Sequence, residues 1–170
     1  MLSAIQVRDP LRRVPEKRIV PAPVAVVATT PSDAHTWNLV YLQLLLEEQG
    51  FVVHNLGPCV PFREVVGECV ATAPDLLVLS SVNGHGAIEI PACAAAVRAR
   101  PEVAGMRIVV GGKLTTEGFL ENRKNREMLS SGVDAVFSPE QPVGDFIDYL
   151  KQFSGVAERL PTTRRGSGIR

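Results

Sequence analysis

The stretch VAVVATTPSDAHTWN, residues 24–38, joins an apolar run directly to a polar turn. Residues 24–30 are rich in valine and carry no charge, which is typical of a strand covered by other elements on both faces. The turn that follows holds Ser32, Asp33 and His35, and a helical pattern of apolar residues comes next. The stretch therefore predicts a buried strand that runs through a polar turn into a helix.

The same alternation of strand and helix continues along the chain. Further strands are predicted at 51–57, 75–81, 107–112 and 134–138, and helices at 36–50, 61–73, 88–100, 121–131 and 142–153. The helix at 36–50 is expected to be largely buried, and Pro91 is expected in the first turn of the helix at 88–100. The alternation favours an α/β fold, with a doubly wound, five-stranded parallel sheet and helices on both faces.

Length and charge predict the domain organisation. The 170 residues suit a single domain, expected at 24–153 between a basic, proline-containing N-terminal tail (1–23) and a flexible C-terminal tail (154–170). The net charge is zero, so neither nucleic acid nor a membrane is expected as a partner. The three cysteines have no paired spacing, and no apolar run approaches the roughly 20 residues of a membrane span, which predicts a soluble, cytoplasmic protein.

Four segments that follow predicted strands are candidates for a ligand site, because doubly wound sheets bind ligands beyond the carboxyl ends of their strands. These segments are PSDAHTWN, SSVNGHGA, GGKLTTEG and SPEQPVG, and none carries a phosphate-binding glycine pattern. In the first segment two interpretations stay open. Either Ser32 or Asp33 caps the following helix, or Asp33 orients His35 toward a metal or a substrate.

Three short motifs in these segments carry a resemblance to a known family. SDAHTWN, SSV and VGGK resemble, in order and separation, the D-x-H-x-x-G … S-x-L … G-G signature of cobalamin-binding domains. DLLVLSSVNGHG, RIVVGGKLTTEG and GVDAVFSPEQP are most similar to the small, cobalamin-carrying subunit of glutamate mutase, also called methylaspartate mutase. The resemblance runs from Val24 to Leu150 and implies a flavodoxin-like (Rossmann-like) fold.

The resemblance implies a role for individual residues. His35 is implied to be the axial cobalt ligand, with Asp33 accepting a hydrogen bond from its other ring nitrogen. Ser80 and Val82 are implied to line the slot for the nucleotide tail of cobalamin, with Ser80 hydrogen-bonded to its base. The implied cofactor-binding set is Ser32, Asp33, Ala34, His35, Thr36, Ser80, Ser81, Val82, Gly84, Gly111, Gly112, Lys113, Leu114, Thr115, Thr116, Glu117 and Pro139.

The glycines and the departures from the signature add detail. Gly111 and Gly112 are implied to let the base lie against bare backbone, with the loop 113–117 beside the ribose and phosphate. Asn38 stands where the signature has its final Gly, and Val82 stands where it has Leu.

Three ring-bearing residues fall outside the signature. Trp37 is predicted to pack in the core or at its rim, although a position beside the corrin edge is an alternative. His54, inside the second strand, is predicted to be a hydrogen-bonded structural histidine. His85, between two glycines, either bonds a corrin amide or meets a partner subunit.

The resemblance also implies an activity. The reaction is an adenosylcobalamin-dependent radical rearrangement, in which cobalt–carbon homolysis leads to hydrogen abstraction from L-glutamate and reversible conversion to 3-methylaspartate. The chain is expected to supply cobalamin binding to this isomerase and no catalytic residue of its own. A separate, larger subunit is the implied partner, because 170 residues leave no room for a substrate-binding barrel.

Three alternatives stay open at the sequence level. A corrinoid methyl-carrier protein uses the same signature but carries a helical bundle ahead of it, and the four prolines within residues 1–23 disfavour such a bundle. Another cobalamin-dependent mutase, acting on an acyl thioester, shares the domain. A flavodoxin-like interaction module without cobalamin is the third.

Overall fold

The computed structural model describes residues 21–116 and 121–153. Its elements in chain order are β1 (Val24–Thr29), α1 (Trp37–Glu48), β2 (Val52–Asn55), α2 (Phe62–Thr72), β3 (Leu76–Ser80), α3 (Gly86–Arg98), a short 3-10 helix η1 (Pro101–Val103), β4 (Arg107–Gly111), α4 (Glu121–Ser130), β5 (Ala135–Phe137) and α5 (Val143–Leu150). Every predicted strand and helix is present, with bounds shifted by a few residues. The two predicted tails fall largely on residues outside the described ranges.

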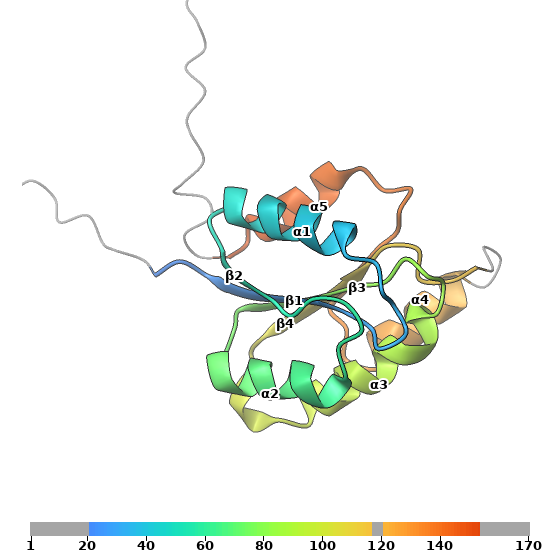
Figure 1. Cartoon of the computed structure of the whole chain (residues 1–170), viewed down its shortest axis with the longest axis horizontal. Helices are drawn as coiled ribbons and strands as arrows, with labels where there is room; N and C mark the ends of the chain where they lie inside the picture. The colour runs from blue at the N-terminus through green and yellow to red at the C-terminus, as the bar shows by residue number, and fades with distance from the viewer. Residues whose placement is uncertain (1–20, 117–120, 154–170) are drawn as a thin grey trace, which may run out of the picture.

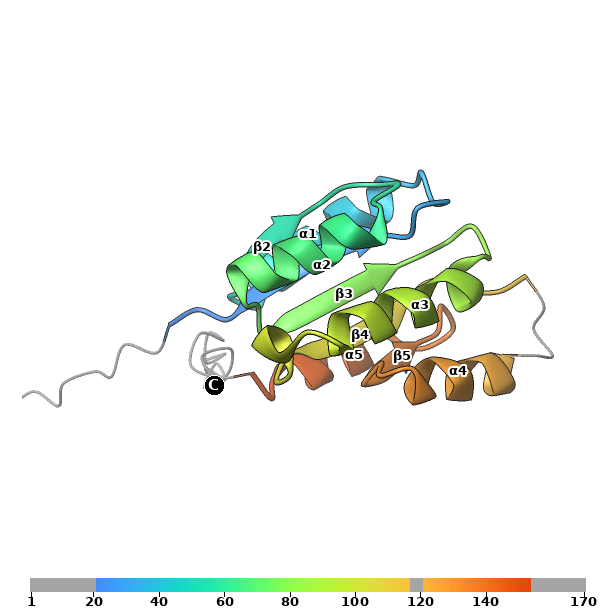
Figure 2. The same cartoon turned by 90° about the horizontal axis from the view of Figure 1, so that it is seen from below.

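The strands form one parallel sheet in the order β2-β1-β3-β4-β5, so the winding direction reverses between β1 and β3 (Figures 1 and 2). This is the predicted doubly wound, flavodoxin-like arrangement. In the register, Thr29 pairs with Ser80, Ser80 with Gly111, and Gly111 with Phe137. The ends of four strands therefore lie in one row at the carboxyl edge of the sheet.

Helices cover both faces of the sheet, as predicted. Helices α1 and α5 lie on one face, and α2, α3 and α4 lie on the other (Figure 1). Val26 and Ala28 of β1 belong to the core on the α2–α3 side, whereas Ala25 and Val27 belong to the core under α1 and α5. Because successive strand residues face opposite sides and both sides are covered, the strand reads as an uninterrupted apolar run.

The predictions that the first helix is largely buried and that Trp37 packs in the core or at its rim are both wrong. Only three apolar residues of α1 are buried: Leu39, Leu45 and Leu46. Four others are exposed on one face of the helix, by 85%, 37%, 53% and 56%: Trp37, Val40, Tyr41 and Leu44. The reason is that α1 packs on β1 and β2 at one side of the sheet, so only part of its surface meets the core.

The predicted place of Pro91 is also wrong. Helix α3 begins at Gly86, two residues earlier than expected, so Pro91 lies inside the helix. The backbone N–H groups of Ile88 and Glu89 already bond to the carbonyl of His85, which starts the helix at the loop after β3. A proline at position 91 then removes only the helical hydrogen bond to the Ala87 carbonyl.

Candidate functional site

The loops after β1, β3 and β4 gather at the edge of the sheet toward which the strand arrows point (Figure 2). The register that pairs Thr29, Ser80 and Gly111 brings the three sequence motifs together there. Residues more than forty positions apart in the chain thus share one site.

Asp33 is the most constrained side chain of this edge and is fully buried. Its Oδ1 accepts the backbone N–H of His35 at 3.0 Å, and its Oδ2 accepts those of Val82 at 2.7 Å and Asn83 at 3.3 Å. Burial alone would raise the pKa of this carboxyl, but the hydrogen bonds outweigh it and lower the pKa to about 2. Asp33 is therefore a buried carboxylate that stays ionised.

His35 is held by that carboxylate through one ring nitrogen. Its Nδ1 lies 2.7 Å from Asp33 Oδ1, and its side chain is 60% exposed. Since an ionised carboxylate can only accept, Nδ1 carries a proton, and in the neutral tautomer of the ring the lone pair is on Nε2. This arrangement suits a histidine that ligates a metal through Nε2.

The backbone of the loop is fixed by the neighbouring strand ends. The Thr29 hydroxyl donates to the Asp33 carbonyl at 2.7 Å and accepts the N–H of Cys59 at 2.9 Å. The same Cys59 N–H also reaches the Asp33 carbonyl at 2.9 Å. Strand β1 and the loop after β2 therefore place Asp33 and His35 before any ligand binds.

The helix-capping interpretation of this turn is wrong. The residue that precedes α1 is Thr36, and no side chain caps the helix. Ser32 turns the other way, because its hydroxyl donates to Glu89 Oε2 at 2.8 Å and accepts from Asn83 Nδ2 at 2.9 Å. Both polar residues of the turn thus connect to the loop after β3 and its helix.

Asn83 joins the first loop to the second and was not singled out from the sequence. Its Nδ2 donates to the carbonyl and hydroxyl of Ser32, and its Oδ1 accepts from the Ser81 hydroxyl at 3.0 Å and the His85 N–H at 2.9 Å. The only sequence signal was its position within SSVNGHG. His85 itself is exposed, directly ahead of α3.

The glycines of the motifs allow the loops to pack on each other. Gly112 has a φ of +96°, and a Cβ there would lie 2.4 Å from the Ser81 carbonyl oxygen. Gly84 has a φ of +84°, and its Cβ would lie 2.5 Å from a methyl carbon of Thr116. A side chain at Gly112 would push the loops after β3 and β4 apart, and one at Gly84 would be strained by its φ and would displace the Thr116 side chain.

A cavity of about 210 Å³ opens beside these loops, between the sheet and the helices α1 and α5. Its walls are mostly apolar, with few polar groups, which is typical of a site for a flat organic group. Residues that line it include Asn38, Tyr41, Ser80, Val82, Gly112 and Phe146. We refer to this cavity as the slot.

Asn38 holds the hydroxyl group of Ser80, which also lines the slot. It is helical, because it lies in the first turn of α1, so the position does not need a positive φ. Its Nδ2 donates to the Ser80 hydroxyl oxygen at 2.8 Å, and its Oδ1 is buried with no hydrogen-bond partner.

The loop after β4 is tied to the loop after β3 by its backbone. The carbonyls of Lys113 and Leu114 accept the N–H groups of Gly84 and Ala87. Leu114 is buried and Thr115 half-buried, whereas Glu117 lies outside the described residues. The remaining candidates at this edge are exposed: Ala34, Thr36, Lys113, Thr116 and Pro139.

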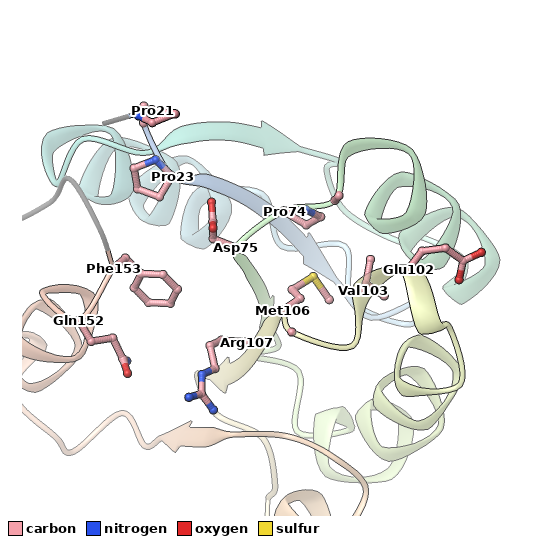
Figure 3. Close-up of a pocket in the computed structure, with 13 residues that line it drawn as sticks. Pro21, Pro23, Pro74, Asp75, Glu102, Val103, Met106, Arg107, Gln152 and Phe153 are labelled. Atoms are coloured by element: carbon pink, nitrogen blue, oxygen red, sulfur yellow. The ribbon is translucent and has the colours of Figure 1, made fainter. Parts of the chain in front are cut away.

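A larger cavity, of about 610 Å³, lies at the opposite, amino edge of the sheet (Figure 3). There Asp75 precedes β3 and accepts the N–H of Val24 at 2.8 Å, while Arg107 starts β4 and bonds to Asp134 at 3.0 Å. None of the motif residues lines it. The candidate site is therefore the smaller slot with Asp33 and His35 beside it.

His54 lies outside the candidate site and bonds to Glu68 Oε1 at 2.8 Å, as predicted for a structural histidine.

Two further observations concern metals and membranes. In residues 21–116 and 121–153, no three His, Cys, Asp or Glu side chains are grouped so as to hold a bare metal ion. The helices in those ranges are also too short or too polar to cross a bilayer.

Comparison with known proteins matches the B12 binding domain model to residues 23–140. The glutamate mutase sigma subunit of Halobacterium salinarum is 33% identical over 144 residues, covering 83% of this chain and 93% of that protein. That of Carboxydothermus hydrogenoformans is 29% identical over 134 residues, covering 77% of this chain and 95% of that protein.

Solved structures match the fold at low identity. A cobalamin-binding protein from Desulfitobacterium hafniense has a TM-score of 0.59 and 20% identity, covering 77% of this chain and 58% of that one. The signal receiver domain of a histidine kinase from Syntrophus aciditrophicus has a TM-score of 0.58 and 14% identity, covering 88% of this chain and all of that one. The backbone alone thus does not separate a cobalamin carrier from a receiver domain, whereas the sequence match does.

Proposed function

The chain belongs to the B12-binding domain family, and we propose that it is the cobalamin-carrying subunit of a carbon-skeleton mutase, converting L-glutamate to 3-methylaspartate. The observation that carries the proposal is the buried, ionised Asp33 that holds Nδ1 of the exposed His35 beside an apolar slot. Similarity to sigma subunits of glutamate mutase supports the choice of substrate.

The residues present fit a cobalamin. His35 offers a single imidazole nitrogen, which suits a metal that brings a ring of its own ligands. The slot offers apolar walls for a flat base, with the Ser80 hydroxyl and a buried, unpartnered Asn38 oxygen as its polar groups. When bound as adenosylcobalamin, the cofactor supplies the cobalt–carbon bond whose cleavage starts radical rearrangements.

The role of the chain is to bind and orient. His35 would ligate cobalt through Nε2, and Asp33 would fix the tautomer of the ring and raise its basicity as a ligand. Ser80, Val82 and Gly112 would enclose the nucleotide tail in the slot. The exposed residues of the loop after β4 would lie toward its ribose and phosphate.

A separate, larger subunit would supply the substrate-binding residues and shield the cofactor from solvent. The exposed apolar face of α1 supports a partner at this edge, because Trp37 lies only two residues from His35 and is 85% exposed. We expect the assembled enzyme in the cytoplasm, where cobalamin would join the two subunits.

The test is electron paramagnetic resonance of the chain mixed with cobalamin and reduced to its paramagnetic cobalt state. Labelling histidine with nitrogen-15 is expected to change the hyperfine pattern, which identifies an imidazole ligand. His35→Ala is expected to abolish that pattern, whereas His54→Ala and His85→Ala preserve it as matched controls. A spectrum that nitrogen-15 leaves unchanged contradicts ligation by any histidine of the chain.

A further inference from the structure

Asn38 stands where the signature has its final glycine, so the chain carries a side chain that the signature lacks. It projects from the first turn of α1, lines the slot, and lies 2.8 Å from the Ser80 hydroxyl oxygen. Two explanations of this contact make opposite predictions. Either Asn38 fills part of the slot and hinders a ligand, or it orients the Ser80 hydroxyl so that this group can donate a hydrogen bond to a ligand.

The direction of the hydrogen bond favours the second explanation. A serine hydroxyl has one proton to donate and two lone pairs to accept with. Because the Asn38 amide donates to Ser80, it takes up a lone pair and leaves the hydroxyl proton for another acceptor. Within the described part of the chain, no acceptor for that proton is found, and Ser80 lines the slot.

The carbonyl end of the amide is left without a partner in the described part of the chain. Asn38 Oδ1 is buried without a hydrogen-bond partner, and such atoms are rare in folded proteins because they are costly. The neighbouring polar residues do not satisfy it, since Ser80 is engaged with the nitrogen of the same amide. The amide is therefore held at its nitrogen end only, and the Ser80 hydroxyl is the donor that a heterocycle in the slot could use.

We propose that Asn38 is a positioning residue for the nucleotide tail, fixing the Ser80 hydroxyl as a hydrogen-bond donor to an unprotonated ring nitrogen of the base. The inference rests on the proposed function, in which the resemblance already implies a bond from Ser80 to the base, and adds the role of Asn38 in setting the direction of that bond. It assigns a favourable role to the position at which the chain departs from the signature.

The experiment compares two probes, cobalamin and cobinamide, which lacks the nucleotide tail. Binding of each is titrated by absorbance to the wild-type chain, Asn38→Ala, Asn38→Gly, Ser80→Ala and the double variant Asn38→Ala/Ser80→Ala. Gln43→Ala removes an amide from the same helix outside the slot and serves as the matched control.

Asn38→Ala and Asn38→Gly are each expected to weaken cobalamin binding by about 2- to 10-fold, the effect of one hydrogen bond. Cobinamide binding and Gln43→Ala should be unaffected. Adding Asn38→Ala to Ser80→Ala should cost nothing more, because the two residues act through one hydroxyl.

The outcomes separate this inference from the proposed function. Unchanged or tighter cobalamin binding by Asn38→Gly overturns the inference and leaves Asn38 as an obstruction, while the proposed function stands. Equal losses for both probes also overturn it, because the effect would then not involve the tail. Absence of cobalamin binding by the wild-type chain overturns the proposed function itself.

Discussion

Two aspartates at opposite edges of the sheet make the same kind of backbone hydrogen bond but hold different side chains. Asp33, at the carboxyl edge, accepts the backbone N–H of Val82, and Asp134, at the amino edge, accepts that of Ile108, each at 2.7 Å. Both carboxylates therefore pin one element to the next along the sheet. They differ in what their remaining bonds hold.

Asp134 holds two guanidinium groups. Its carboxylate accepts hydrogen bonds from Arg98 at 2.5 Å and from Arg107 at 3.0 Å. Arg98 also donates to the backbone carbonyls of Met106 and Gly132. These hydrogen bonds all join one part of the fold to another. Asp33 instead holds an imidazole whose second nitrogen remains available. In the proposed function, the same kind of contact would serve stability at one edge of the sheet and binding at the other.

Removing His35 tests the binding end directly. His35→Ala is expected to lower cobalamin affinity by more than about 100-fold, beyond the 10- to 100-fold typical of losing a residue that only orients a metal ligand. The thermal unfolding midpoint should change little, because the side chain is 60% exposed. Titration with cobalamin measures the affinity, and a circular dichroism melt measures the stability. If His35→Ala fails to fold even without cofactor, the proposal that His35 acts in binding and not in stability is contradicted.

Asp33→Asn tests the orienting role. The variant keeps the size of the side chain but loses the negative charge that holds the proton on His35 Nδ1, so cobalamin affinity should fall by about 10- to 100-fold. The hyperfine pattern of bound histidine should persist, since His35 is still present. A loss equal to that of His35→Ala would show that Asp33 does more than orient the ring.

Asp134→Asn sharpens the contrast from the other end. It leaves the half-buried Arg98 without its charged partner, so the free energy of unfolding should fall by about 1–3 kcal/mol. Cobalamin affinity should remain that of the wild-type chain. Arg107→Gln, whose side chain is 54% exposed, is the matched control and should cost less than about 1 kcal/mol in urea unfolding.

Acid should affect stability through Asp33 in a defined window. The fold lowers its pKa from 3.8 to about 2, so its contribution is fully present above pH 4 and is lost as the pH falls through 2. Such a shift corresponds to about 2 kcal/mol. Urea unfolding between pH 5 and pH 2 should show this loss in the wild-type chain and not in Asp33→Asn, and identical profiles would contradict it.

Much of the fold and of the site could be predicted from local sequence. Strands β1, β3 and β4 are short, largely apolar runs whose ends are marked by polar or glycine residues, and the parallel register brings those ends into one row. Asp33 and His35 lie two residues apart, so their contact needed no knowledge of the rest of the chain.

Contacts between distant loops could not be predicted in that way. Asn83 bonds to Ser32 across 51 positions, and nothing in either loop alone indicates the partner. Helix α1 is apolar on more than one face, a pattern typical of a buried helix, yet only one face packs on β1 and β2 and the other is exposed. The position of Pro91 within its helix could not be predicted, because the start of a helix depends on the geometry of the preceding loop and not only on local helix propensity.

The smallest expected effect on stability concerns Trp37, at the same edge as His35. Because the side chain is 85% exposed, Trp37→Ser should change the free energy of unfolding by no more than about 0.5 kcal/mol. If a larger subunit covers this edge, the substitution should nevertheless weaken assembly with that subunit, measured by sedimentation with and without adenosylcobalamin. Leu129→Ser, an exposed apolar residue of α4 on the other face, is the control and should leave assembly unchanged. Equal effects of the two substitutions would mean that the partner does not cover the α1 face.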